Sequence, residues 1–242
     1  MIRTKAIAKT TLTVLLACAG AFSTRPAGAS IVNGGFESGT LSGWSSIGDA
    51  SVVTSTFGSG PIGGMYQALV QGGAGGTSAG ALETFAQIPG GSLDALGNGI
   101  VHGGSAIQQT FTATAGQLLS FQWNFITDEL PPSVFNDFAF WSLNGSSSTL
   151  ASANGSTLIP FSTELQMGFE NASFVISTTG TYTLDFGVAN VSDPGGLPQL
   201  LVDDVQLTSS TPEPIYAPWI AFVTATMLVA MLLRKKDVAK ER

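Results

Sequence analysis

The chain has 242 residues, of which 44% are hydrophobic and only 10% charged, and its formal net charge is −7 at pH 7. All nine Lys and Arg residues lie in the first 25 or the last nine positions, so residues 30–233 contain neither. Because nucleic-acid affinity comes largely from Lys and Arg that displace counterions from phosphates, this layout excludes DNA and RNA as partners.

The N-terminal segment, residues 1–29, has the pattern of a cleaved secretory signal peptide. A short basic region precedes an apolar run over residues 10–22, and Ala27-Gly28-Ala29 forms a small-x-small cleavage site before Ser30. The apolar run is shorter than the about 20 residues that span a bilayer. Cleavage after Ala29 and export are therefore predicted.

The only cysteine, Cys18, lies inside this segment. Leu15-Leu16-Ala17-Cys18 loosely matches a lipobox, so a lipid on Cys18 is an alternative to plain cleavage. Cleavage after Ala29 would leave a mature chain without cysteine. Disulfides, thiol catalysis and cysteine-ligated metals would then be absent together.

The acidic residues have no basic partners nearby in the sequence. Residues 30–233 hold 14 of the 16 Asp and Glu residues and the single histidine, His102. Each carboxylate must therefore be solvated, capped by backbone N–H groups, or paired with a bound cation. Calcium is the hard cation that oxygen ligands select outside the cell, so structural Ca²⁺ is the expected cofactor, with plain solvation as the alternative.

Residues 30–207 are expected to form one all-β domain, a β-sandwich of many short strands. Runs rich in β-branched and aromatic residues recur between clusters of Gly, Asn, Ser and Pro, which is typical of such a fold. No window has the period of an amphipathic helix. The expected strands are residues 51–56, 65–70, 106–112, 117–125, 138–143, 172–177, 182–188 and 200–207.

Two of these strands show which side chains should be buried. Apolar and polar residues alternate over 119–125, which puts Leu119, Phe121, Trp123 and Phe125 on the core face. The same alternation in the last strand points Leu201, Val205 and Leu207 inward. It makes Asp203 an inward carboxylate that needs a partner.

The loop at residues 128–137 is a second group of oxygen-bearing side chains. Two prolines stiffen it, and Asp128, Glu129, Asn136 and Asp137 flank them, which suggests a site for a cation or for sugar hydroxyls. The spacing fits no EF-hand loop. The alternative is that these residues cap their own backbone in turns.

The next strand, residues 138–143, carries aromatics on both faces, so either Trp141 or the Phe138 and Phe140 pair is a candidate for an exposed face that stacks on sugar rings. Core filling is the alternative. Trp44 and Trp123 are expected to be buried.

A catalytic centre is not evident. His102 lies in a predicted Gly-rich turn, and no acid can be placed to complete a triad with Ser105. Asp128 with Asp137 would be the first candidates for a glycosidase carboxylate pair.

The C-terminal end has three consecutive parts. A linker with a Pro-Glu-Pro triplet, residues 208–214, precedes a mostly apolar run over residues 215–233, and a basic tail, residues 234–242, follows. The run is long enough for a transmembrane helix, and the basic cluster places its end in the cytoplasm. The acidic domain in front is then outside.

This order of parts resembles the PEP-CTERM sorting signal of Gram-negative bacteria with exopolysaccharide loci. The resemblance implies recognition and cleavage by an exosortase-type membrane enzyme, with transfer from the inner membrane to the cell surface or extracellular matrix. The matching positions are Pro212, Glu213 and Pro214 for the signal and Arg234, Lys235 and Lys236 for the retention cluster. A plain single-span anchor is the alternative.

The exported domain resembles the jelly-roll domains of carbohydrate-binding modules. Its opening segment, residues 32–39 followed by Trp44, looks like the first strand of those domains, and residues 201–207 look like their last strand. The resemblance implies that the two ends pair and that a structural calcium lies between them. Glu37 and Asp203, with Asp204 as the alternative, would be the ligands.

These observations together predict a non-enzymatic, surface-sorted protein of the cell envelope or exopolysaccharide matrix that binds carbohydrate. The alternatives are an extracellular glycoside hydrolase with paired carboxylates and a purely structural membrane-anchored protein.

Overall fold

The computed structural model describes residues 30–155 and 157–209. The predicted signal peptide with Cys18, Ala27 and Ala29 lies outside these residues, and so do the Pro212 to Pro214 triplet, the helix predicted over residues 215–233 and the basic tail. Within the described ranges, no helix is long and apolar enough to cross a membrane.

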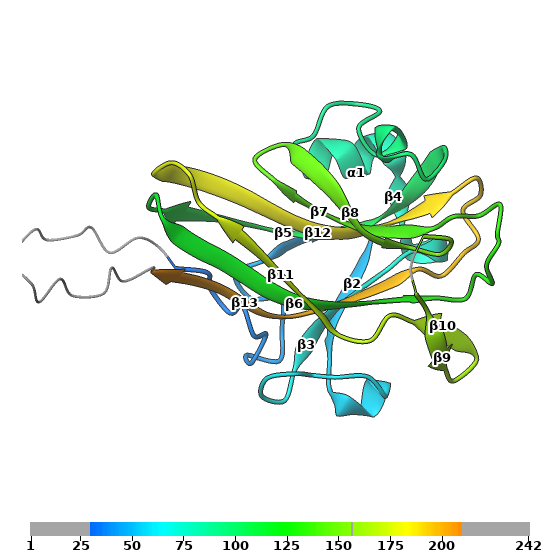
Figure 1. The fold of residues 1–242 in the computed structure, drawn as a ribbon, viewed down its shortest axis with the longest axis horizontal. Helices are drawn as coiled ribbons and strands as arrows, with labels where there is room; N and C mark the ends of the chain where they lie inside the picture. Colours follow the sequence, from blue (N-terminus) through cyan, green and yellow to red (C-terminus); the bar gives the residue numbers. More distant parts are fainter. Residues whose placement is uncertain (1–29, 156, 210–242) are drawn as a thin grey trace, which may run out of the picture.

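The described residues fold as an all-β sandwich of two antiparallel sheets (Figure 1). The first sheet consists, in spatial order, of β1 (Ser45–Ile47), β5 (Val101–Ala113), β12 (Gly180–Val191), β7 (Phe138–Leu143) and β8 (Ser146–Ser152), with β4 (Thr77–Ser78) beside β5. The second consists of β2 (Asp49–Val53), β3 (Gln67–Gln71), β13 (Gln199–Ser209), β6 (Gln117–Thr127), β10 (Glu164–Gln166) and β9 (Ile159–Phe161), with β11 (Glu170–Val175) beside β6. Short helices join them: η1 (Ser55–Phe57), η2 (Gly73–Gly75), α1 (Ala79–Phe85) and η3 (Asp94–Leu96).

The predicted all-β class is confirmed, and each of the eight predicted strands overlaps an observed one. Pattern reasoning missed α1, which has only seven residues and is too short to show a helical period. It also missed β8, a Ser-rich strand that pairs with β7 along its length. His102 was placed in a turn, but it lies on β5.

The main core lies between the sheets and is rich in aromatic rings. Leu119, Phe121, Trp123 and Phe125 are all buried in it, as their alternation predicts. Trp44 is buried there as well, 6.0 Å from the Phe186 ring, and Phe186 meets Phe121 edge-on at 4.7 Å. Edge-to-face contacts of this kind stabilise a core beyond simple area burial.

The aromatic side chains of strand β7 pack into two different apolar clusters, one on each face of the first sheet. Phe138 and Phe140 face a second apolar cluster, formed with Leu82 of α1 and Leu93 on the outer side of the first sheet. Trp141 points between the sheets and is half-buried against the main core. Burial on both faces explains why this strand shows no apolar and polar alternation.

The alternation predicted for the last strand is only partly correct. A β-bulge interrupts the β13–β6 pairing between Asp203 and Gln206, and a bulge changes which face the following residues occupy. Before the bulge, Leu200 and Val202 face the main core, whereas Leu201 packs on the outer face with Leu69 and Ile126.

Asp203 shares that outer face, opposite Gln122 of β6. It is fully buried there under the loop over residues 58–66 and does not point into the core between the sheets. After the bulge, Val205 and Leu207 pack toward the main core as predicted.

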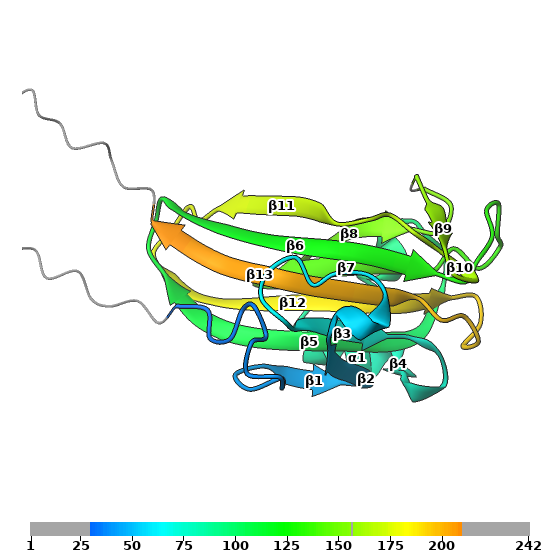
Figure 2. The same ribbon diagram turned by 90° about the horizontal axis from the view of Figure 1, so that it is seen from below.

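The opening segment also differs from its prediction. Residues 32–39 form turns rather than a strand. They still lie against the last strand, because the Val205 N–H donates to the Gly34 carbonyl at 3.0 Å and a side chain on Gly34 would collide with the Val205 carbonyl. Both ends of the described chain therefore lie at one end of the sandwich (Figures 1 and 2).

Candidate functional site

The structure brings together the three carboxylates that the resemblance to jelly-roll modules singled out. An ideal Cβ on Gly35 would lie 3.7 to 4.0 Å from atoms of Glu37, Asp203 and Asp204. The opening turns bring Glu37 to this point, and the bulge in β13 brings the two aspartates. Three acidic side chains from the beginning and the end of the domain's sequence thus lie close together beside the 58–66 loop.

Backbone amides are the partners of two of these carboxylates. Glu37 accepts hydrogen bonds from the N–H groups of Met65 and Tyr66, at 3.0 Å each. Asp203 Oδ2 accepts from Ile62 and Gly63 at 2.9 Å, and its Oδ1 accepts from Asp204 N–H at 2.7 Å. Burial raises the pKa of Asp203, although these three donors act in the opposite direction.

Calcium at this point stays a prediction. Among the residues that the structure describes, no group of three or more His, Cys, Asp or Glu side chains is arranged to hold a metal. A structural Ca²⁺ should stabilise the folded state by mass action, so its removal by a chelator is expected to lower the melting temperature of the purified chain. An unchanged melting temperature would end the calcium prediction and leave the backbone amides as the partners of Glu37 and Asp203.

The oxygen-bearing side chains of the loop at residues 128–137 do not converge on one site; each accepts a hydrogen bond from a different residue. Asp137 is fully buried and accepts from Val191 N–H at 2.7 Å, while Asp128 accepts from Leu197 N–H at 2.9 Å. Both aspartates therefore hold the loop over residues 191–198. Asn136 instead accepts from Asn154 N–H at 2.9 Å, and Glu129 accepts from the Ser133 hydroxyl at 2.7 Å.

The buried position of Asp137 changes its acidity. Burial raises its pKa to about 7, the Val191 hydrogen bond opposes this, and the nearby carboxylates of Glu129, Asp128 and Asp193 raise it further. This carboxyl group is enclosed by protein, because Asp137 is fully buried.

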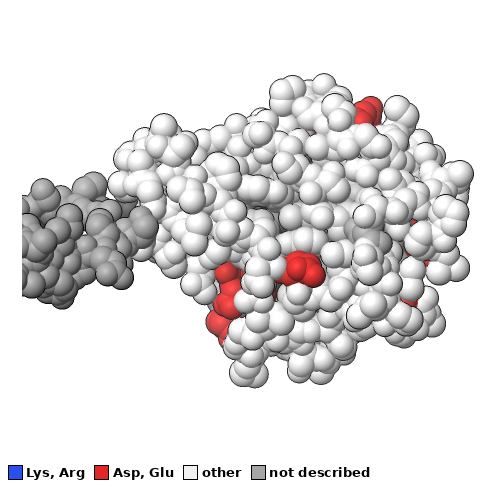
Figure 3. All heavy atoms as spheres, viewed as in Figure 1, with Lys and Arg blue, Asp and Glu red and all other residues white. Residues whose placement is uncertain are grey.

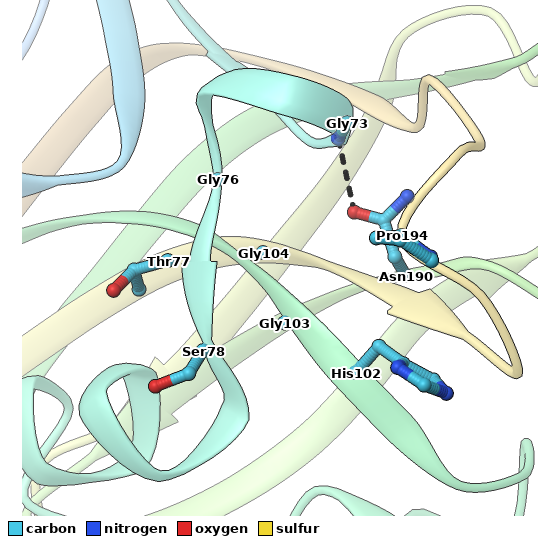
Figure 4. Close-up of a pocket in the computed structure, with 9 residues that line it drawn as sticks. All are labelled: Gly73, Gly76, Thr77, Ser78, His102, Gly103, Gly104, Asn190 and Pro194. Carbon is cyan, nitrogen blue, oxygen red and sulfur yellow. Dashed lines mark hydrogen bonds between the residues drawn. The ribbon is translucent and has the colours of Figure 1, made fainter.

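A pocket of about 210 Å³ lies next to the loop over residues 191–198 (Figure 4). Four glycines line it together with Thr77, Ser78, His102, Asn190 and Pro194. Both polar atoms of the Asn190 amide already have partners in the fold. Its Oδ1 accepts from Gly73 N–H at 3.0 Å, and its Nδ2 donates to the Gly196 carbonyl at 2.7 Å. His102 is exposed, and its imidazole makes no hydrogen bond with any described residue. The pocket thus lacks an oriented acid–base pair.

A groove of about 190 Å³ lies on the outer face of the second sheet, the face seen in Figure 2. Polar side chains from three adjacent strands line it: Ser120 and Gln122 of β6, Asn171 and Ser173 of β11, and Asp204 and Gln206 of β13. We call this surface the polar groove. Its position follows from the pairing of Gln122 with Asn171 on one side and with Asp203 on the other.

The groups of the polar groove are largely free of internal partners. Among the described residues, the side chains of the groove make one hydrogen bond, which Gln122 Nε2 donates to Asp204 Oδ2 at 3.4 Å. Asn171, Ser173 and Gln206 are exposed. Amide and hydroxyl groups that the fold does not use are available to a ligand.

Trp141, the predicted sugar platform, is not among the residues that line this groove. Its half-buried ring lies 5.5 Å from Phe121 and 6.1 Å from Phe174. Phe174 on β11 is 39% exposed, so the aromatic surface at this edge of the sandwich belongs to Phe174 as well as to Trp141.

Comparisons with known proteins give a fold likeness. No family model matches the chain, and no curated protein matches it. Among solved structures, the module TmCBM61 in complex with β-1,4-galactotriose is 15% identical with a TM-score of 0.41, over 75% of this chain and 99% of that one. A carbohydrate-binding module of the β-sandwich superfamily is 12% identical with a TM-score of 0.42, over 76% and 64%. The K3 adhesin domain of Lys-gingipain from Porphyromonas gingivalis is 12% identical with a TM-score of 0.37, over 75% and 100%. With TM-scores below 0.5, these likenesses carry no information about the ligand of this chain.

The polar groove was not predicted from the sequence. Its residues come from three strands that are separated by tens of positions, and each one looks like an ordinary solvent-facing residue of an alternating strand. Within the strand over residues 117–125, the polar positions Ser120 and Gln122 were the only signal. They marked an outer face but did not show which strands would flank it.

Proposed function

We propose that this protein is an exported, non-enzymatic carbohydrate-binding protein of the bacterial cell envelope or exopolysaccharide matrix, and that the polar groove holds the sugar. The observation that carries the proposal is the row of amide and hydroxyl side chains on an open sheet face, among which only Gln122 makes a side-chain hydrogen bond to a described residue. Sugars present many hydroxyls, and each one can both donate and accept. A few convergent polar groups suffice to orient such a ligand.

The proposed route to the surface follows from the two ends of the sequence. Signal-peptide cleavage would export the chain, and the Pro212 to Pro214 triplet with its apolar run would present it to an exosortase-type enzyme in the inner membrane. Intact-mass measurement of the protein recovered from cells would report cleavage after Ala29, a lipid on Cys18 and processing near Pro214 in one spectrum.

The glycoside hydrolase alternative requires accessible paired carboxylates. Asp128 and Asp137, its first candidates, are engaged in holding the 191–198 loop, and Asp137 is fully buried. Reducing ends released from native polysaccharide by the wild type, and not by Asp128→Asn, would establish hydrolysis and overturn the non-enzymatic proposal.

Removing the free amides of the groove is the direct test of binding. In affinity electrophoresis through gels that contain polysaccharide extracted from the source cells, the Asn171→Ala/Gln206→Ala variant is expected to lose about tenfold or more in affinity. The reason is that two side chains that hydrogen-bond the sugar disappear, at about 1 kcal/mol each. Both residues are exposed, so the melting temperature should stay within a few degrees of the parent.

The control changes two hydroxyl-bearing residues of the first sheet, the exposed Thr181 and the half-buried Ser147. Thr181 and Ser147 are outside the groove, and Thr181→Ala/Ser147→Ala should bind like the parent. Trp141→Ala separates the groove from the aromatic edge. Unchanged binding by the groove variant together with lost binding by a folded Trp141→Ala variant would move the sugar site to Trp141.

A further inference from the structure

The charge of the whole sandwich restricts what the polar groove can accept. Of the 16 acidic residues, all but Glu213, Asp237 and Glu241 fall within residues 30–209, which leaves 13 carboxyl groups and no Lys or Arg in that range. The face in Figure 3 accordingly shows acidic side chains and no basic one. No described side chain other than His102 can supply a positive charge to a ligand.

The groove itself has a fixed negative end. Asp204 lines it, and Glu37 and Asp203 lie beside Asp204 around Gly35. Backbone N–H groups hold the oxygens of Glu37 and Asp203, whereas Asp204 has only the 3.4 Å bond from Gln122 to its Oδ2. Asp204 also has a left-handed backbone, with φ of 48°.

We infer that the ligand of the polar groove is a glycan without carboxylate, sulfate or phosphate groups, and that one of its hydroxyls or amines donates to Asp204. This inference rests on the proposed function. The free amides of Asn171 and Gln206 supply donors and acceptors for hydroxyls, and Asp204 accepts a hydrogen bond from the ligand.

An acidic glycan would meet the opposite conditions. Its anionic groups would lie near Asp204 without any cation to balance them, and specificity against a competing ligand arises from such unpaired like charges. The neutral amides donate a stronger hydrogen bond to a carboxylate than to a hydroxyl, but they supply no positive charge that would balance the carboxylate against Asp204.

The test uses the full chain in detergent and two fractions of the polysaccharide from the source cells, separated by anion exchange into neutral and acidic material. Part of the acidic fraction is also reduced at its carboxyl groups, which keeps the linkages and removes the charge. The expected result is retention by the neutral fraction, no retention by the acidic fraction at low salt, and at least tenfold stronger retention of the acidic fraction after reduction.

Two variants report whether Asp204 is responsible. Asp204→Asn should weaken retention by the neutral fraction about tenfold, because a hydrogen bond to a charged acceptor is replaced by one to a neutral amide. Asp49→Asn removes the same charge at an exposed carboxyl outside the groove and should change nothing.

The outcomes separate the two proposals. Retention by the acidic fraction that is as strong as by the neutral one, or that appears only with added Ca²⁺, overturns the inference and leaves carbohydrate binding intact. Retention by neither fraction, before or after reduction, overturns the proposed function itself. Asp204→Asn and Asp49→Asn behaving alike would remove Asp204 from the site.

Discussion

Replacing Asp185 by Asn is expected to make the protein more stable at pH 8 and to leave its stability at pH 4 nearly unchanged. Asp185 lies fully buried on the outer side of the first sheet, where Gln108 Nε2 donates to its Oδ1 at 2.8 Å and the Ser142 hydroxyl donates to its Oδ2 at 2.7 Å. Burial raises its pKa from 3.8 to about 7, although these two hydrogen bonds oppose the change.

The direction of the pH dependence follows from proton binding. Between pH 3.8 and about 7 the folded chain keeps the Asp185 proton that the unfolded chain has lost, so the free energy of unfolding falls as the pH rises through this window. Below the window both states are protonated, and above it the folded state contains a buried carboxylate. The full difference corresponds to about 4 kcal/mol at 1.36 kcal/mol for each pKa unit.

The Asn side chain keeps the shape of the neutral acid. Its oxygen can accept from Gln108, and its NH₂ group can donate to the Ser142 oxygen, so the contact between α1 and the sheet through Gln108 and the Phe85 carbonyl is preserved. Urea unfolding of the full chain from pH 4 to pH 8 should show a flatter slope for Asp185→Asn than for the parent. Asp137, whose pKa is also about 7, contributes to the slope that remains, as do Asp203 and Glu164, whose pKa values burial raises.

An exposed carboxylate provides the control for net charge. Asp49→Asn lowers the charge by the same amount at an exposed position, and its unfolding curve should follow the parent at every pH. A slope in Asp185→Asn equal to that of the parent would show that the folded state does not retain the Asp185 proton over this window. A loss of stability at pH 8 would show that Asp185 is ionised and favourably paired in the folded state.

Replacing Gly64 by Ala is expected to destabilise the fold by about 2–3 kcal/mol in the same assay. Gly64 has a left-handed backbone, with φ of 61°, which costs an alanine about 1 kcal/mol. A Cβ at this position would also lie 2.2 Å from Glu37 Cδ. Glu37 would have to swing away and lose its hydrogen bonds to Met65 and Tyr66, at a further cost of about 1–2 kcal/mol.

Gly91 separates these two contributions. Its φ of 80° is also left-handed, but a Cβ there would meet no atom within 4 Å. Gly91→Ala should therefore cost only about 1 kcal/mol. In a double-mutant cycle, Glu37→Ala should remove the additional cost of Gly64→Ala. Additive effects in that cycle would mean that Glu37 does not hold the 58–66 loop.

Much of the sandwich could be predicted because its strands are long and locally consistent. Period-2 alternation identified the buried face of β6 from four residues, and β-branched and aromatic runs identified seven further strands, although they missed the short or Ser-rich strands β1, β4, β8, β9 and β10. The inner face of β13 was misplaced because the bulge after Asp203 changes the phase of the alternation in mid-strand. A bulge depends on how the partner strand pairs, and no local pattern in residues 199–209 reveals it.

The candidate site was less predictable than the fold. Sequence reasoning associated Glu37 with Asp203 and Asp204 through a resemblance, and the structure brings the three together. No sequence pattern indicated that backbone amides of the 58–66 loop would donate hydrogen bonds to the carboxylates of Glu37 and Asp203. The polar groove could not be predicted, because a side chain is free to bind a ligand only if no neighbouring strand supplies it with a hydrogen-bond partner. The sequence does not show which strands are neighbours.

The sequence by itself determined that every carboxylate in residues 30–209 must find a partner other than Lys or Arg, because the range contains neither. Only the tertiary structure decided which partner each one has. Backbone amides hold Glu37 and Asp203, burial raises the pKa of Asp137 and Asp185 to about 7, and Asp204 is left facing an open groove. The reason is physical: composition fixes which charges exist, whereas solvent exposure and donor geometry arise only when distant strands pack together.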